Sequence, residues 1–172
     1  HHRRPHHLPG ILAAMGFCGG VWDQVRAQVR TVIPRVDDCV SLLLATDDRY
    51  IPNCKESGHL YLYEDDPEKF SVLSLLKDYR KASKEFQGLD EETLFHMWFD
   101  QYYFLNIIDT GYNDCYELAY AEQAQKNADM IHAALDYVQG SNRILEKLVS
   151  GEWDEQFLVA EPGHLIRHGD FF

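Results

Sequence analysis

The sequence lacks the short motifs that identify several common enzyme classes. It contains no G-x-S-x-G nucleophile elbow, no phosphate-binding G-x-x-x-x-G-K, no G-x-G-x-x-G and no H-E-x-x-H. Elbow-type hydrolases, nucleotide-binding loops and HExxH metalloproteases are therefore not indicated. Cys115 and His132 are too far apart along one helix, roughly 25 Å at 1.5 Å per residue, to form a catalytic dyad.

Long hydrophobic runs and closely spaced cysteines are also missing. No apolar segment reaches the roughly 20 residues that a membrane-spanning helix needs. The four cysteines, at positions 18, 39, 54 and 115, show neither zinc-knuckle nor redox-dithiol spacing. Reduced, mostly buried thiols are the default expectation, and a Cys39–Cys54 disulfide is an alternative if the compartment is oxidising.

Basic residues are scarce after the first segment. Residues 1–35 carry five Arg against one Asp, whereas residues 36–172 carry 27 acids against 11 Lys and Arg, a formal charge of −16. A body this acidic repels phosphate backbones, which argues against a nucleic-acid partner. The basic start suits an anionic membrane surface or an acidic protein. Its Arg and His residues fit an organelle-targeting remnant, although residues 1–7 also fit a tag.

Aromatic residues are abundant, at 22 of the 172. The stretch 89–108, LDEETLFHMWFDQYYFLNII, is apolar round most of a helical wheel. This pattern predicts the central helix of a helical domain, capped by Asp90 and closed by Gly111.

Capping signals and periodicity predict further helices on both sides of this stretch. One helix is expected from Asp66-Pro67 to Gly88. A second begins at an Asp114–Glu117 capping box and runs to Gln139, with a heptad seam over residues 121–138. A third occupies residues 141–150 and ends at Gly151.

The region before Pro67 is more mixed. We expect an amphipathic helix over residues 21–33 that Pro34 stops, and a short helix with Asp37 or Asp38 as its N-cap. HLYLYEDD, at 59–66, alternates like a short strand, but no partner strand is visible in the chain.

These elements predict a mostly α fold, an irregular helical domain of about four to six helices. Residues 1–35 form a basic and apolar N-terminal docking arm, and residues 36–66 combine loop, short helix and strand. Residues 67–150 form the helical body, and residues 151–172 form an aromatic C-terminal docking tail.

Candidate interaction residues come from the arm, the strand and the tail. Gly16 and Gly20 have the small-residue spacing that allows helices to approach closely in apolar surroundings. The remaining candidates are apolar or basic residues without an evident core position. They are Trp22, Arg26, Arg30, Tyr61, Tyr63, Trp153, Phe171 and Phe172.

One polar strip could carry chemistry. Glu92, His96, Asp100 and Tyr103 share a face of the expected central helix, and Glu122 on the next helix could join them. Di-iron bundles also place acids and histidines on inward faces, but their signature is Glu-x-x-His, whereas this chain has Glu-x-x-x-His. A solvated strip is therefore favoured, and no metal or other cofactor is expected.

Two short segments resemble known families. WFDQYYFL (98–105) is similar to the aromatic Gln-Asp-Tyr helix of thiaminase II and haem-oxygenase-like enzymes, although here the acid precedes Gln101. LLKDYRKASKEF (75–86) resembles the start of mitochondrial LYR proteins, with Asp78 in place of that family's Leu. Neither resemblance assigns a role to a residue.

The leading functional hypothesis is a non-catalytic accessory subunit of a larger, membrane-associated complex, of the mitochondrial respiratory or ATP synthase type. Its partners would be other protein subunits, with a membrane surface or lipid contacting the N-terminal arm. The alternative is a small enzyme or metal- or ligand-binding protein with its site on the central helix, in which case the protein could be cytoplasmic. A third hypothesis is a secreted effector with Cys39 and Cys54 oxidised.

Overall fold

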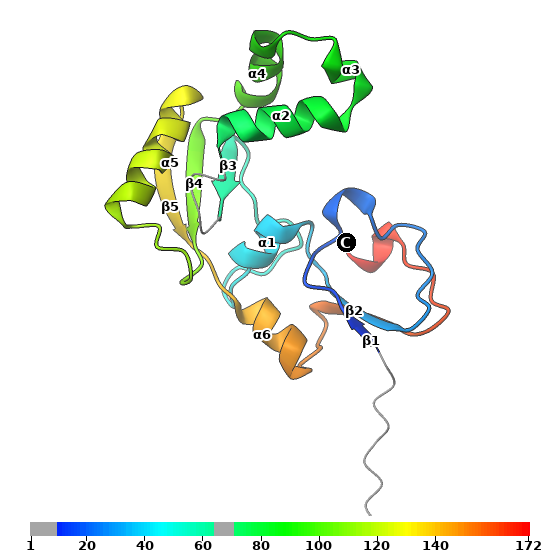
Figure 1. The fold of residues 1–172 in the computed structure, drawn as a ribbon. Helices are drawn as coiled ribbons and strands as arrows, with labels where there is room; N and C mark the ends of the chain where they lie inside the picture. Colours follow the sequence, from blue (N-terminus) through cyan, green and yellow to red (C-terminus); the bar gives the residue numbers. More distant parts are fainter. Residues whose placement is uncertain (1–9, 64–70) are drawn as a thin grey trace, which may run out of the picture. The chain divides into compact units, whose positions relative to one another are not determined.

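The computed structural model describes residues 10–63 and 71–172. Over these residues the chain is mixed α/β, with two three-stranded sheets and six α-helices, so the prediction of a mostly α fold is wrong. The chain divides into two compact units (Figure 1). Unit 1 contains the chain up to Cys54 together with Ser141–Phe172, and unit 2 is Lys55–Gly140.

The sheet of unit 1 has the order β1-β2-β6, formed by β1 (Gly10–Leu12), β2 (Arg30–Pro34) and β6 (Phe157–Ala160). β2 runs parallel to β1 and antiparallel to β6. The prediction of a helix over residues 21–33 is therefore wrong. Thr31, Val32 and Ile33 are consecutive β-branched residues that are all buried, which is typical of a strand covered on both faces.

The start of one helix in unit 1 and the end of another lie where the sequence predicts. Asp38 caps α1 (Cys39–Leu44) by accepting the Ser41 N–H, and Gly151 ends α6 (Arg143–Ser150) at φ 83°. Both predictions are confirmed, although α6 begins at Arg143 and not at Ser141. Two 3₁₀ turns, η1 (Cys18–Gly20) and η2 (His168–Asp170), complete the unit.

The core of unit 1 joins the two ends of the described chain. Phe17 packs with Ile33, Leu158, Ile166 and Phe171. The C-terminal tail therefore lies within this unit: β6 is a strand of its sheet, and Phe171 is 3% exposed.

The sheet of unit 2 is entirely parallel and has the order β3-β4-β5. Its strands are β3 (His59–Leu62), β4 (Phe104–Asp109) and β5 (Ala134–Gln139). The expected strand beginning at His59 is confirmed. The expectation that it has no partner in the chain is wrong, because it pairs along Phe104–Ile107.

The predicted central helix over 89–108 contains two elements rather than one. Asp90 caps α4 (Glu91–Phe99) as expected, but the chain then turns and enters β4 at Phe104. Leu105, Ile107 and Ile108 are fully buried. A central parallel strand is covered on both faces and reads as a continuous apolar run, which a helical wheel cannot distinguish from a buried helix.

The predicted helix with the heptad seam also contains two elements. α5 (Leu118–Met130) ends before a turn in which His132 has φ 56°, and β5 begins at Ala134. Ala124 and Ala128 from the predicted seam are buried against the sheet, whereas Leu135 and Val138 belong to the strand. Figure 1 shows α5 running alongside β4 and β5.

Three helices connect β3 to β4. They are α2 (Val72–Ala82), α3 (Lys84–Gln87) and α4. Ser71 caps α2 in a reciprocal capping box with Ser74, whereas Asp66 and Pro67 lie outside the described residues. The core of unit 2 places these helices and α5 on the sheet, through residues that include Leu76, Leu94, Phe99, Leu105 and Tyr120.

Candidate functional site

A pocket lies where the central strand of unit 2 ends. β4 ends at Asp109, α5 begins at Leu118, and the loop between them lines an open pocket of about 340 Å³. In open α/β sheets, ligands bind outside the carboxyl ends of the parallel strands. The volume is within the range of small-molecule sites. The lining residues are Asp109, Gly111, Asn113, Asp114, Cys115, Tyr116 and Glu117.

Asn113 fixes the shape of this loop. Its side-chain amide donates to the Ile108 carbonyl oxygen at 2.9 Å, and its Oδ1 accepts both the N–H and the hydroxyl of Thr110 at 3.1 Å. The residue is 5% exposed, so these bonds satisfy a polar group that is shielded from water. The loop is therefore tied to the strand that precedes it.

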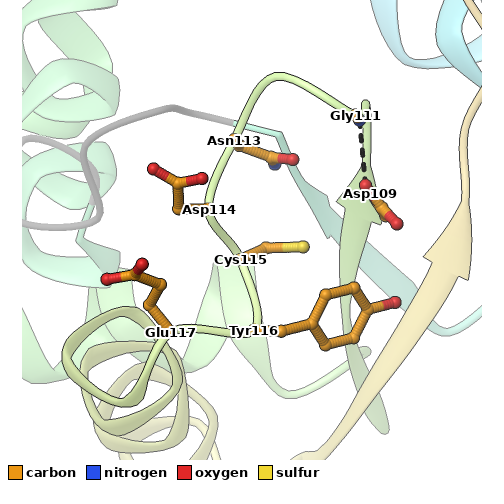
Figure 2. A pocket seen from close by; sticks show the side chains of 7 residues that line it. All are labelled: Asp109, Gly111, Asn113, Asp114, Cys115, Tyr116 and Glu117. Atoms are coloured by element: carbon orange, nitrogen blue, oxygen red, sulfur yellow. Dashed lines mark hydrogen bonds between the residues drawn. The ribbon is translucent and has the colours of Figure 1, made fainter.

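Asp109 links the strand to the turn. Its Oδ1 accepts the Gly111 N–H at 2.9 Å, as Figure 2 shows. Gly111 has φ 78°, a left-handed conformation that glycine adopts without a steric penalty. The Asp109 carbonyl oxygen accepts the Gly140 N–H at 2.8 Å, which ties the end of β4 to the end of β5.

Two tyrosines form an aromatic surface beside the pocket. The ring of Tyr116 stacks on Tyr137 of β5, with centroids 4.9 Å apart and an interplanar angle of 21°. Burial raises the pKa of Tyr137, as do Cys115 and Tyr116 beside it. The Tyr137 hydroxyl is therefore neutral at physiological pH.

Cys115 lies at the base of the loop with its side chain fully buried. Burial, followed by the negative charge of Asp109 and Asp114, raises the pKa of its thiol. The nucleophilic form of cysteine is the thiolate, so a buried thiol of raised pKa is a poor nucleophile at neutral pH. The arrangement favours binding over covalent chemistry at Cys115.

The charge of the pocket is negative. Asp109, Asp114 and Glu117 line it, and among the described residues, 10–63 and 71–172, its lining contains no Lys, Arg or His. Figure 2 shows Asp114 and Glu117 projecting from one side of the loop and Tyr116 from the other. Glu117 is the N-cap of α5 but makes no side-chain capping hydrogen bond, so the predicted Asp114–Glu117 capping box is wrong.

The structure places the predicted polar strip on the outside of unit 2. His96 and Asp100 are hydrogen-bonded at 3.0 Å, and the Asp100 carboxylate raises the pKa of the His96 imidazole. Glu92 and Glu122 are exposed, and Tyr103 lies beyond the end of α4 with 69% of its surface exposed. Only the His96–Asp100 pair is brought together.

Most of the predicted interaction residues contact their own unit. The Trp22 indole donates to the Gly16 carbonyl oxygen at 3.1 Å, and Trp153 donates to Leu148 at 2.8 Å. Further contacts join Arg26 to Gly163, Arg30 to Glu161 and Tyr61 to Glu56. Phe172 is 49% exposed, and Tyr63 is half-buried. Gly16 and Gly20 do not share a helix face, because Gly20 belongs to the 3₁₀ turn η1 and has φ 96°.

The sequence patterns do not reveal the residues that form the pocket. They predict a helix end at Gly111 and a helix start at Asp114 and Glu117. The available signal was the segment FLNII followed by DTGYNDCYE, an apolar run that leads into polar and glycine-bearing residues before a helix. That order is typical of a strand, loop and helix in a parallel α/β unit.

The described ranges, 10–63 and 71–172, contain no group of three or more His, Cys, Asp or Glu residues that could hold a metal ion. Among the helices in this part of the chain, none is both long and apolar enough to cross a membrane.

The fold and the pocket define an α/β protein with a ligand-sized space at the carboxyl end of a parallel sheet. Comparison with known families adds that the chain belongs to the family described as protein of unknown function DUF1638, whose model matches residues 3–149. The match covers most of unit 1 and all of unit 2. No curated protein and no solved structure matches the chain.

Proposed function

We propose that unit 2 binds a small molecule bearing several hydroxyl or amino groups in the pocket that follows β4. The observation that carries this proposal is the lining itself. Three carboxylates, Asp109, Asp114 and Glu117, line an open pocket of about 340 Å³ at the edge of the sheet where α/β proteins bind ligands. Carboxylates accept hydrogen bonds and attract cations, so the preferred ligand supplies donors or positive charge.

The electrostatics argue against a phosphate ligand. The N-terminus of a helix such as α5 ordinarily attracts anions. Here Glu117 is the N-cap residue and Asp114 lies just before it, so negative charge is already in place. A phosphate would approach three carboxylates, and the part of the lining that the structure describes holds no compensating base.

The tyrosine stack supplies the apolar part of the site. Tyr116 is 66% exposed, and its other face packs on Tyr137, so the ring is held in one orientation. A fixed aromatic ring beside carboxylates suits the carbon skeleton of an amine or a sugar, and a tyrosine face also attracts cations. The hydrogen bonds of Asn113 keep the loop in shape before the ligand arrives.

The test is a titration of the ¹⁵N-labelled full chain with four probes: spermidine, ethanolamine, ribose and inorganic phosphate. We expect the amide resonances of Gly111, Asn113 and Tyr116 to move with an amine or a sugar and to remain in place with phosphate. Asp109→Asn should weaken the binding about tenfold, the value of one charge-assisted hydrogen bond.

Glu122→Gln is the matched control, because Glu122 is an exposed acid on α5 outside the pocket. It should bind as the wild-type chain does. The proposal is wrong if no probe moves the loop resonances at millimolar concentration, or if phosphate moves them at lower concentration than the amines do.

A second candidate is the accessory subunit expected from the sequence, with the mitochondrial and membrane-associated location that belongs to it. It is favoured by apolar side chains on the surface of unit 1. Ile11 and Leu12 of the edge strand β1 are 50% and 45% exposed, and Val21 is 57% exposed. The native mass of the protein, gently extracted from its source, tests this candidate. Defined co-purifying chains would support it, and a free 20 kDa monomer would contradict it.

A further inference from the structure

Two cysteines far apart in the sequence meet in unit 1. The Sγ atoms of Cys18 and Cys39 lie 3.9 Å apart, although the residues are 21 positions apart in the chain. Cys18 begins η1, and Cys39 begins α1. Both are half-buried, and both are free thiols.

Backbone contacts hold the two segments together. The Phe17 N–H donates to the Val36 carbonyl oxygen at 2.8 Å, and the Cys18 N–H donates to the Asp37 carbonyl oxygen at 2.7 Å. Gly16 allows this approach, because a Cβ atom there would lie 2.4 Å from the Val36 oxygen. The thiols are therefore placed side by side by the main chain rather than by a chance rotamer.

The other two cysteines are held apart from this pair. Cys54 is 5% exposed, and its thiol donates to the Ile51 carbonyl oxygen at 3.3 Å. Cys115 is fully buried in the loop of unit 2. The sequence left a Cys39–Cys54 disulfide open as an alternative. In the structure the thiol beside Cys39 belongs to Cys18, so the fold does not favour that pairing.

We propose that Cys18 and Cys39 are a redox modification site that closes into an intramolecular disulfide. In a disulfide the sulfur atoms are about 2 Å apart. Rotation of the two side chains, with a small adjustment of the backbone, would bring them to this distance. The closed loop would contain all of β2, so that oxidation cross-links the segment before this strand to the helix after it.

The step balances with a low-molecular-weight disulfide as the oxidant, for example oxidised glutathione. The thiolate of one cysteine attacks a glutathione sulfur, the glutathione S–S bond breaks, and one glutathione leaves as a thiolate. The second cysteine then attacks the mixed disulfide at the protein sulfur and releases the second glutathione. Two electrons pass from the cysteine sulfurs to the reagent, and the two cysteine protons are taken up by the glutathione thiolates.

The reduced pair is stable in the absence of an oxidant. Burial, followed by the neighbouring Cys39, raises the pKa of Cys18 to about 11. At neutral pH Cys18 is therefore almost entirely the unreactive thiol. The pair is expected to respond to sustained oxidising conditions rather than to brief ones.

The experiment oxidises the full chain. The reduced protein is freed of reductant, incubated with oxidised glutathione, denatured, and its thiols are counted by alkylation and intact mass. We expect the count to fall from four to two with the loss of two hydrogen atoms and no added glutathione. A peptide map without reduction should join the peptides that contain Cys18 and Cys39.

Cys18→Ala and Cys39→Ala are the matched variants. Each should fail to lose the two hydrogen atoms, and Cys18→Ala should instead take up one glutathione at Cys39. The far-ultraviolet circular dichroism reports whether each variant is folded. If a variant does not fold, the wild-type peptide map decides alone. A count that stays at four, a link that involves Cys54 or Cys115, or a link between two chains would overturn the proposal.

Discussion

The side-chain amide of Asn113 donates to the Ile108 carbonyl oxygen across 2.9 Å, which joins the loop of the candidate site to its central strand. Asn113 also accepts two hydrogen bonds from Thr110. Replacing it by Ala removes all three bonds and leaves a buried carbonyl without its donor. The expected loss in the free energy of unfolding is about 1–3 kcal/mol, measured by urea titration.

Tyr112→Ala is the control for this prediction, because Tyr112 is the preceding residue and is 77% exposed. Its effect should stay within about 0.5 kcal/mol. Equal stabilities of the two variants would mean that Asn113 does not hold the loop. Asn113→Asp keeps an acceptor toward Thr110 but places a carboxylate oxygen against the Ile108 carbonyl oxygen in a buried site, so it should destabilise the chain at least as much as Asn113→Ala.

The His96–Asp100 pair on α4 predicts a pH dependence. The hydrogen bond that the His96 ring donates to the Asp100 carboxylate, and then the charge of that carboxylate, raise the pKa of His96 in the folded chain. Stability from this pair is fully present below the ordinary histidine pKa of about 6.5 and is lost as the pH rises through the raised, folded-state pKa. The side chains are 58% and 65% exposed, so the contribution to stability is small.

An NMR titration of the His96 ring protons measures this shift directly. Asp100→Asn should lower the midpoint, whereas Asp78→Asn, which removes an exposed acid on α2, should leave it in place. If the wild-type chain and Asp100→Asn share one midpoint, the raised pKa does not arise from Asp100.

Leu105 lies in the part of the chain where strand and helix were confused. It is fully buried in the core of unit 2, whereas Leu118 at the start of α5 is 74% exposed. Leu105→Ala should lower the free energy of unfolding by about 2–5 kcal/mol through lost burial and the cavity left behind. Leu118→Ala should change it by less than about 0.5 kcal/mol. Comparable effects, measured by urea titration, would contradict the position of β4 in the sheet.

The features that sequence predicted correctly are local. Asp38 and Asp90 cap helices, and Gly151 ends one, because each acts through bonds or dihedral angles within a few residues. The strand at His59 was also recognised from its alternation. These signals depend on neighbours in sequence, so a single chain reveals them.

The features that were missed depend on the sheets. Residues 105–108 are buried in a central strand, and their largely apolar pattern is the same as that of a buried helix. The heptad seam predicted over residues 121–138 includes a turn at His132. No glycine or proline lies in this segment to indicate that the helix ends there. The pocket was missed for the same reason, since its position depends on where β4 ends.

Gly16 provides a test of the contact that aligns Cys18 with Cys39. A Cβ atom at this position would lie 2.4 Å from the Val36 carbonyl oxygen and 2.9 Å from the Asp38 nitrogen. Both neighbours are backbone atoms of the segment that leads into α1, so neither can move aside as the end of a flexible side chain could. Gly16→Ala should therefore lower the free energy of unfolding by about 1–3 kcal/mol through overpacking. It should also slow the formation of the Cys18–Cys39 disulfide.

Gly169→Ala is the control in the same unit, because a Cβ atom at Gly169 meets no atom within 4 Å. It should leave both the free energy of unfolding and the rate of disulfide formation close to the wild-type values. If Gly16→Ala is as stable as Gly169→Ala, the two backbone segments are not in the contact described. If it is destabilised but oxidises at the wild-type rate, the thiols are brought together by something other than the approach at Gly16.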